Sequence, residues 1–185
     1  NNSQLFGIQT NQDILQAILT DQDFINGQVH IHWLTDQLSK LHQKLQLNQN
    51  HSVHLGLLAC TLFWHQAWLH ARSNANFDLN ASHSSSFHQH LCAPFARPLV
   101  FQNSEQLHHF SVLCRKQNSK LILQLSHANE NFEFELMYAC FDQKIKQLQL
   151  LHQGQSYRVK YSEDNEHSLW IQTSWGNSSI QDRSF

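Results

Sequence analysis

A long apolar segment near the middle of the chain sets the strongest constraint on its fold. Residues 53–71 read VHLGLLACTLFWHQAWLHA and place apolar side chains at almost every position around a helix. Only a thin polar stripe interrupts them, formed by His54, Thr61, His65 and Arg72 at spacings of seven, four and seven. A helix that is apolar nearly all round is buried on most of its circumference. A helix over about residues 51–72 therefore needs other elements to cover it.

The same segment is not expected to cross a membrane. It falls short of the about 20 mostly apolar residues that a membrane span requires. It also contains His54, His65, Gln66 and His70. We therefore expect no membrane partner.

The second half of the chain predicts the elements that cover this helix. Apolar and polar residues alternate with a period of two, which is typical of half-buried strands, at residues 110–115, 121–125, 132–139, 157–161 and 169–173, and more weakly at 145–151. Two further short strands are expected at residues 98–102 and 180–185. Turn-forming residues such as HANEN, HQGQ and GNSS separate these runs. Closing a sheet into a barrel removes its exposed edges. The prediction is an α+β fold, an antiparallel β-barrel of about eight strands wrapped around a long central apolar helix, preceded by a short helical segment.

The start of the chain predicts that short helical segment. Thr10 and Asp13 have the spacing of a capping box, and Ile14, Leu15, Ile18 and Leu19 follow at helical spacing before a stop at Gly27. We expect residues 28–34 to be an extended tail and residues 35–50 a linker with some helix. Residues 73–96 lack a regular pattern and predict a long loop.

Composition excludes several classes of protein. Charged residues make up 14% of the chain, the net charge is -2, and Lys and Arg do not cluster, so no nucleic-acid partner is expected. The four cysteines (Cys60, Cys92, Cys114 and Cys140) form no CxxC pair and are interpreted as free, buried thiols of a reducing compartment. No signal peptide is visible. We therefore expect a cytoplasmic location.

Histidine is the residue type that most invites a functional interpretation. The 15 histidines include close pairs at His30 and His32, His88 and His90, and His108 and His109. A catalytic zinc site needs three protein ligands, and no third ligand stands at a familiar spacing. The pairs are interpreted as solvated surface residues, and no metal site is predicted.

Catalytic motifs are absent from the sequence. No GxSxG or glycine-rich phosphate loop can be written from the five glycines. Asp21 and Asp23 are interpreted as helix caps, and Glu133 and Glu135 as a solvated strand face. Trp64 and Trp68 are interpreted as packing residues of the apolar helix. We therefore predict no catalytic and no cofactor-binding residue.

The first helical segment carries a family resemblance. Residues 7–34 read GIQTNQDILQAILTDQDFINGQVHIHWL, and the matching positions are Gly7, Thr10, Asn11, Asp13, Ile14, Leu15, Phe24, Gly27, Val29 and His30. This stretch resembles the terminal segment of the biotin carboxylase domain in biotin-dependent acyl-CoA carboxylases, and is most similar to the biotinylated subunits of the methylcrotonyl-CoA carboxylase group.

The resemblance implies a place within a larger subunit. Residues 1–35 would be the tail of the biotin carboxylase domain, and residues 36–185 the domain that links biotin carboxylase and carboxyltransferase. The family combines a long helix with an eight-stranded antiparallel barrel, and the strand runs here extend over about residues 98–185. The implied function is non-catalytic, docking the biotin carboxylase half onto the carboxyltransferase subunit.

The cofactors and remaining partners implied by the resemblance belong to the whole enzyme. The full subunit would use biotin, ATP and Mg, and this segment would hold none of them. Its partners would be the carboxyltransferase subunit and the biotin carboxylase and biotinyl domains of its own chain. Met137 is followed by Tyr138, so the Met-Lys-Met target of biotinylation is not found here.

The loop at 73–96 is expected to act as a hook for the partner. Phe87, Leu91, Pro94 and Phe95 are apolar residues in a segment with little strand to bury them, and loops on rigid scaffolds often carry contacts. An equally open interpretation is that they cover one end of the barrel.

Two other functions of the chain remain open at this point. One is a lipocalin-like barrel that binds a small molecule, and the other is a small enzyme that uses the histidine pairs.

Overall fold

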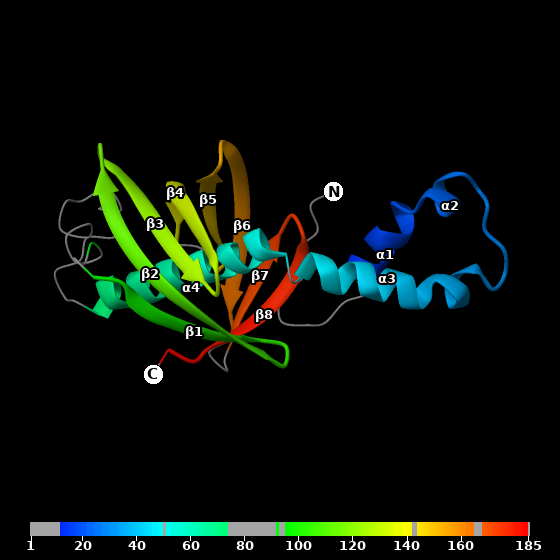
Figure 1. Ribbon diagram of the computed structural model, residues 1–185, viewed down its shortest axis with the longest axis horizontal. Coiled ribbons are helices and arrows are strands. Elements are labelled where there is room, and N and C mark those ends of the chain that lie inside the picture. The colour runs from blue at the N-terminus through cyan, green and yellow to red at the C-terminus, as the bar shows by residue number, and fades with distance from the viewer. Residues whose placement is uncertain are drawn as a thin grey trace.

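The structure is a computed structural model that describes residues 12–49, 51–73, 92, 95–141, 144–164 and 168–184. Within these residues, four helices precede eight strands (Figure 1). The helices are α1 (Gln12–Leu19), α2 (Gln22–Ile25), α3 (Trp33–Gln49) and α4 (Ser52–Ser73). The strands are β1 (Arg97–Asn103), β2 (Gln106–Gln117), β3 (Lys120–His127), β4 (Glu130–Cys140), β5 (Lys146–His152), β6 (Gln155–Glu163), β7 (Ser168–Thr173) and β8 (Gly176–Asp182).

The strands form a closed antiparallel barrel in the order β1 to β8, with β1 paired to β8. The predicted α+β class and the eight-stranded antiparallel barrel are therefore confirmed. Each of the eight predicted strand segments corresponds to one strand of the barrel. Two of the hairpins have tight turns in which both central residues, Asn118 with Ser119 and Gln153 with Gly154, have positive φ. Turns of this kind match the right-handed twist of the flanking strands.

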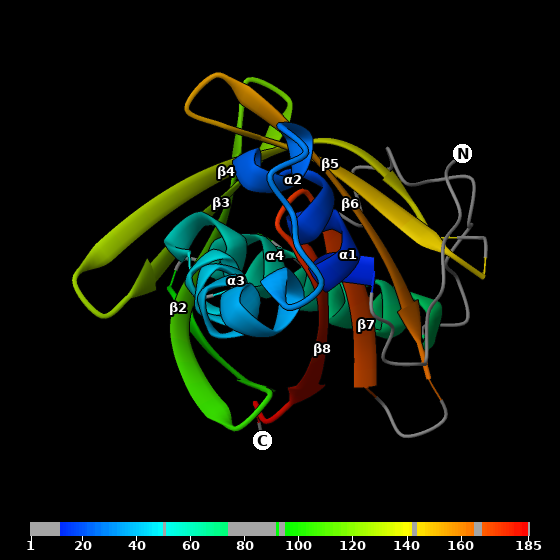
Figure 2. The ribbon, with the colours of Figure 1, turned by 90° about the vertical axis from the view of Figure 1, so that its right-hand side faces the viewer.

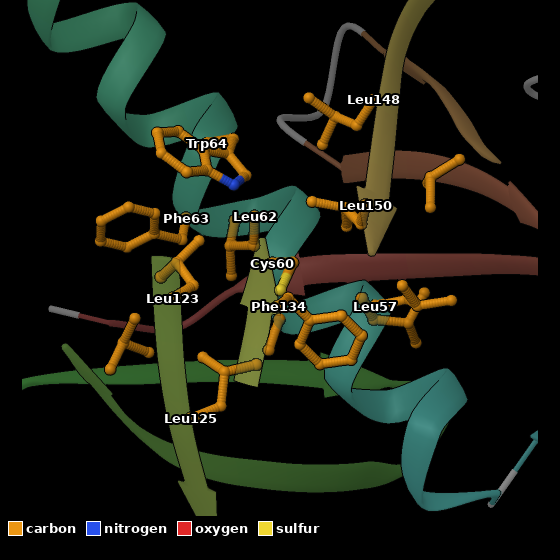
Figure 3. Packing of buried hydrophobic residues seen from close by; sticks show 14 of the residues in the cluster. Leu57, Cys60, Leu62, Phe63, Trp64, Leu123, Leu125, Phe134, Leu148 and Leu150 are labelled. Atoms are coloured by element: carbon orange, nitrogen blue, oxygen red, sulfur yellow. The ribbon is translucent and has the colours of Figure 1, made fainter. Parts of the chain in front are cut away.

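Helix α4 occupies the residues of the predicted apolar helix and shares one hydrophobic core with the strands. Leu57, Leu62 and Trp64 of α4 are fully buried together with Phe134 and Leu150 of the barrel. Figure 3 shows these side chains packed between α4 and the neighbouring strands. Burial of this apolar area is the main favourable term that holds the helix and the strands together.

Helices α1 to α3 form an arm that projects from one end of the barrel (Figures 1 and 2). The predicted opening helix is divided into α1 and α2, and Asp21 caps α2 by accepting a hydrogen bond from the backbone N of Asp23 at 3.0 Å. Gly27 follows α2 with φ of +69°, the left-handed conformation expected after a helix.

The extended tail predicted for residues 28–34 was wrong in part, and the linker with some helix predicted for residues 35–50 underestimated the helix. Residues 31–32 form a turn rather than part of an extended tail, and α3 extends without interruption from Trp33 to Gln49. The helix packs against α1, and its Trp33 and Leu41 are buried. Tertiary packing has overridden a weak local pattern here. The expected domain division between residues 35 and 36 falls inside this helix.

The predicted hook loop at 73–96 lies mostly outside the described residues, which include Cys92, Phe95 and Ala96 of it. In the part of the chain that the structure describes, none of the helices has the length and apolar character needed to cross a membrane.

Candidate functional site

Three residues of the polar stripe of α4 are the first feature that could carry function, because the barrel buries them. His54, Thr61 and His65 are all at most 4% exposed. Thr61 donates a hydrogen bond back to the carbonyl of Leu57 at 2.7 Å. The two histidines each contact polar groups of the barrel and form the centres of two separate clusters. Buried polar groups of this kind need partners because losing water is costly for them.

The His54 network joins the first turn of α4 to strands β7 and β8. The Nε2 of His54 lies 3.0 Å from the Ser178 hydroxyl, and its Nδ1 lies 3.0 Å from the Thr173 hydroxyl. Burial, assisted by the neighbouring His51, lowers the pKa of His54 to about 4. The ring is therefore neutral at pH 7, and both of its nitrogens have partners. This network stabilises the junction of helix and barrel.

The Lys146 cluster lies further along α4 and consists of Lys146, Glu163, His65, Trp68 and Tyr161. The ammonium of Lys146 is 4.0 Å from a carboxylate oxygen of Glu163, and the Nε2 of His65 is 3.6 Å from the same oxygen. Lys146 also lies over the rings of Trp68 and Tyr161, at 4.8 and 5.6 Å from their centroids. Such cation–π contacts strengthen when they are desolvated.

The electrostatics of the Lys146 cluster suit a structural ion pair. Burial lowers the pKa of His65 to about 4, although the Glu163 carboxylate acts in the opposite direction. Burial and the charge of Glu163 raise the pKa of the Tyr161 hydroxyl. At pH 7 the cluster therefore combines a neutral imidazole, a neutral phenol and one ion pair. It links α4 to β5 and β6 and presents no activated nucleophile.

Sequence reasoning missed the Lys146 cluster. The residue lies in the weakest of the predicted strands, two positions before Leu148 and four before Leu150. That parity places it on the inward face, where Leu148 and Leu150 are fully buried. The sequence pattern that could have indicated the cluster is a lysine on the apolar face of a predicted strand.

Two of the four cysteines are held as neutral thiols. All four are free, Cys60 and Cys114 are buried, and Cys92 and Cys140 are partly buried. Burial raises the pKa of the Cys60 and Cys114 thiols. The reactive form of cysteine is the thiolate, so these two groups are unreactive at neutral pH.

The interpretation of the histidine pairs as solvated was wrong for His108, and three histidines outside the pairs are also buried. His54, His65, His108 and His152 are buried inside the barrel. His108 faces inward because alternate residues of β2 share the core face with Phe110. His30 and His32 do not share a strand face, since this segment forms no strand. His88 and His90 lie outside the described residues.

Some of the other predicted roles agree with the structure. Asp21 caps α2, whereas Asp23, which was also predicted to be a cap, lies in the first turn of that helix. Glu135 pairs with Lys120 at 2.8 Å on the outer face of the barrel. Trp64 and Trp68 pack in the core. The described residues contain no group of three or more histidine, cysteine, aspartate or glutamate side chains that could hold a metal ion.

Of the four residues expected to contact a partner, the structure describes one. Phe95 is 66% exposed just before β1, whereas Phe87, Leu91 and Pro94 lie outside the described residues.

A larger set of exposed apolar side chains lies on the helical arm, namely Leu15, Leu19, Phe24, Ile25, Val29, Ile31, Leu34 and Leu38. Exposed apolar patches mark interaction surfaces.

Comparison of the chain with protein-family models and with curated proteins finds no match.

Proposed function

We propose that this chain is a non-catalytic assembly module of a biotin-dependent acyl-CoA carboxylase of the methylcrotonyl-CoA type. In this proposal α4 is the long central helix of the barrel, and the module docks the biotin carboxylase half onto the carboxyltransferase subunit. The observation that carries the proposal is the core that α4 shares with the strands. Side chains occupy the interior, so the surfaces are what the module offers to other molecules.

The helical arm supports this proposal from the other end of the chain. The segment that resembles the end of a biotin carboxylase domain is also the one whose apolar side chains are most exposed, with Ile31 at 92%. In a complete carboxylase subunit the rest of that domain would cover these side chains. Covering exposed apolar area is favourable by about 25 cal/mol per Å².

The interior chemistry is consistent with a module that has no reaction of its own. Biotin, ATP and Mg would serve other domains of the holoenzyme, which would be the ligase. Burial lowers the pKa of His54 and raises the pKa of the Cys60 thiol, so both groups are held in their neutral forms. Free cysteines also fit the cytoplasmic location proposed for the enzyme.

The lipocalin-like alternative has no observation in its favour, because α4 shares one hydrophobic core with the inward strand residues.

A binding measurement against a purified carboxyltransferase subunit of a methylcrotonyl-CoA carboxylase tests the function. We expect the unmodified chain to bind, and a chain that lacks residues 84–94 to bind at least tenfold more weakly, since anchoring residues dominate interface energies. Unchanged affinity after the deletion would show that the loop is no hook. No binding by the unmodified chain would remove the docking function itself.

A pair of point variants makes the same test without deleting the loop. Phe95→Ser removes an aromatic side chain that is 66% exposed, so the barrel core is left intact. Leu107→Ser is the matched control, because Leu107 is 52% exposed at the other end of the β1–β2 hairpin. We expect Phe95→Ser to weaken binding and Leu107→Ser to leave it unchanged. Equal effects of the two variants would contradict a contact at Phe95.

A further inference from the structure

Two histidines meet inside the barrel at the end formed by the β1–β2 and β3–β4 turns. His108 of β2 is buried, with 7% of its surface exposed, and its ring lies 5.3 Å from that of Phe101. His127, the last residue of β3, is half-buried and stacks on Phe110 with ring centroids 4.4 Å apart. The centroids of the two imidazoles are 5.7 Å apart and the rings are tilted by 57°.

The hydrogen bond of His127 fixes its tautomer. Its Nδ1 lies 2.8 Å from the backbone carbonyl of His109, and a carbonyl can only accept, so Nδ1 carries the hydrogen. In the neutral ring Nε2 then holds a free lone pair. Histidines that bind metal ions commonly donate their other ring N–H to a backbone carbonyl in this way. His127 is therefore oriented as a ligand.

The opposing histidine has a ring nitrogen for which the structure provides no protein partner. The Nε2 of His108 is buried and has no hydrogen-bond partner among the residues that the structure describes, which is costly unless something occupies the position. A ring nitrogen of histidine is a common metal ligand.

The separation of the rings suits a shared ion. Imidazole nitrogens bind Zn²⁺ at about 2.0–2.1 Å, which puts the centroids of two rings on one ion roughly 5–6 Å apart. The observed 5.7 Å lies in that range. We propose that His108 and His127 form a two-histidine site for a borderline divalent transition-metal ion such as Zn²⁺, with water in the remaining positions. This site does not depend on the proposed carboxylase function.

Histidine NMR of the reduced full-length chain, titrated with Zn²⁺ at pH 7, tests the site. We expect the Nε2 resonances of His108 and His127 to move together and saturate at one equivalent of Zn²⁺. His108→Phe and His127→Phe should each weaken this binding at least tenfold. His108→Gln serves in place of His108→Phe if the aromatic variant fails to fold.

The chain offers a matched control in His152. Its Nδ1 lies 2.8 Å from the carbonyl of Glu133, and its ring stacks on Phe134 at 4.6 Å, so it repeats the local arrangement of His127. His152→Phe should leave Zn²⁺ binding unchanged. The site would be overturned if Zn²⁺ moved His152 as readily as His127, or if it bound only at exposed histidines. The site would also be overturned if the Nε2 of His108 exchanged with water and its resonance did not move on addition of Zn²⁺.

Discussion

Gly56 shows how a single residue sets the distance between α4 and β4. A Cβ added at this position would lie 3.0 Å from Cε2 and 3.1 Å from Cζ of Phe134. Phe134 is buried and stacked on His152, so its ring has little room to move. Gly56→Ala would gain about 1 kcal/mol in helix propensity, but overpacking costs about 1–3 kcal/mol. We expect a net decrease in the free energy of unfolding, measured by urea denaturation.

A double-mutant cycle separates these two effects of Gly56→Ala. In a Phe134→Leu background the added methyl group has space, so the same substitution should become neutral or stabilising. Coupling between the two positions is expected because they are in contact. A stabilising effect of Gly56→Ala in the unmodified chain would show that the Phe134 ring yields.

His54 makes the stability of the barrel depend on pH. Its pKa is lowered from 6.5 to about 4 in the folded chain, so the unfolded chain binds the proton more readily. The free energy of unfolding therefore falls as the pH drops from about 6.5 to 4. One pH unit of difference in pKa corresponds to about 1.4 kcal/mol, so His54 alone accounts for a loss of about 3 kcal/mol by pH 4.

The variant His54→Gln keeps hydrogen-bonding groups near Thr173 and Ser178 but cannot be protonated in this range. We expect its free energy of unfolding to be lower at pH 7 and to vary less between pH 6.5 and 4 than that of the unmodified chain. The exposed His109→Gln is the control and should retain the full slope. Parallel profiles for His54→Gln and the unmodified chain would contradict the burial of a neutral imidazole.

The sequence predicts the role of a residue well where that role depends on neighbours in the chain. It predicts the role poorly where the role depends on how the strands close into a barrel. The cap at Asp21 and the packing of Trp64 follow from neighbours in the chain. The burial of His108 and Lys146 depends on which strand face turns inward and on what lies across it. A periodicity of two separates the two faces of a strand. It does not show which residue a buried polar side chain will contact.

At the scale of elements, the seam between β1 and β8 is the weak part of the barrel. The two strands pair over residues 101–103 and 180–182, and the chain beyond β8 extends the contact. The backbone N of Val100 donates to the Ser184 hydroxyl at 3.0 Å, and the N of Arg183 donates to the Val100 carbonyl at 2.8 Å. Ser184 thus provides a hydrogen bond where the ladder has ended.

Removing that hydroxyl should loosen the seam locally. We expect Ser184→Ala to lower the free energy of unfolding by about 1 kcal/mol and to speed hydrogen exchange at the Val100 amide. Ser126→Ala is the control, because the Ser126 hydroxyl donates to Asn131 on the exposed face, where water can replace it. Unchanged protection of Val100 would show that the Ser184 hydroxyl does not hold the seam.

The elements themselves differ in how far the sequence predicts them. Most of the strands were recognised because their alternation is regular and turn-forming residues separate them. The helix α3 was predicted only in part, since TDQLSKLHQKLQLNQN offers few apolar residues and the helix packs against α1. Contacts between segments that are separate in the sequence cannot be predicted from the local periodicity of either segment.

At the scale of the whole molecule, the arm and the barrel bury their apolar residues separately. The main core draws its residues from α4 onward, whereas the buried apolar residues of the arm are Ala17, Trp33 and Leu41. We expect a chain of residues 51–185 to keep the barrel, with a free energy of unfolding within about 2 kcal/mol of the full chain. Near-ultraviolet circular dichroism and urea denaturation measure this. If the shortened chain instead bound a hydrophobic dye and lost its cooperative transition, the arm would be part of the folding unit, and its exposed apolar face could not be a surface held ready for another domain.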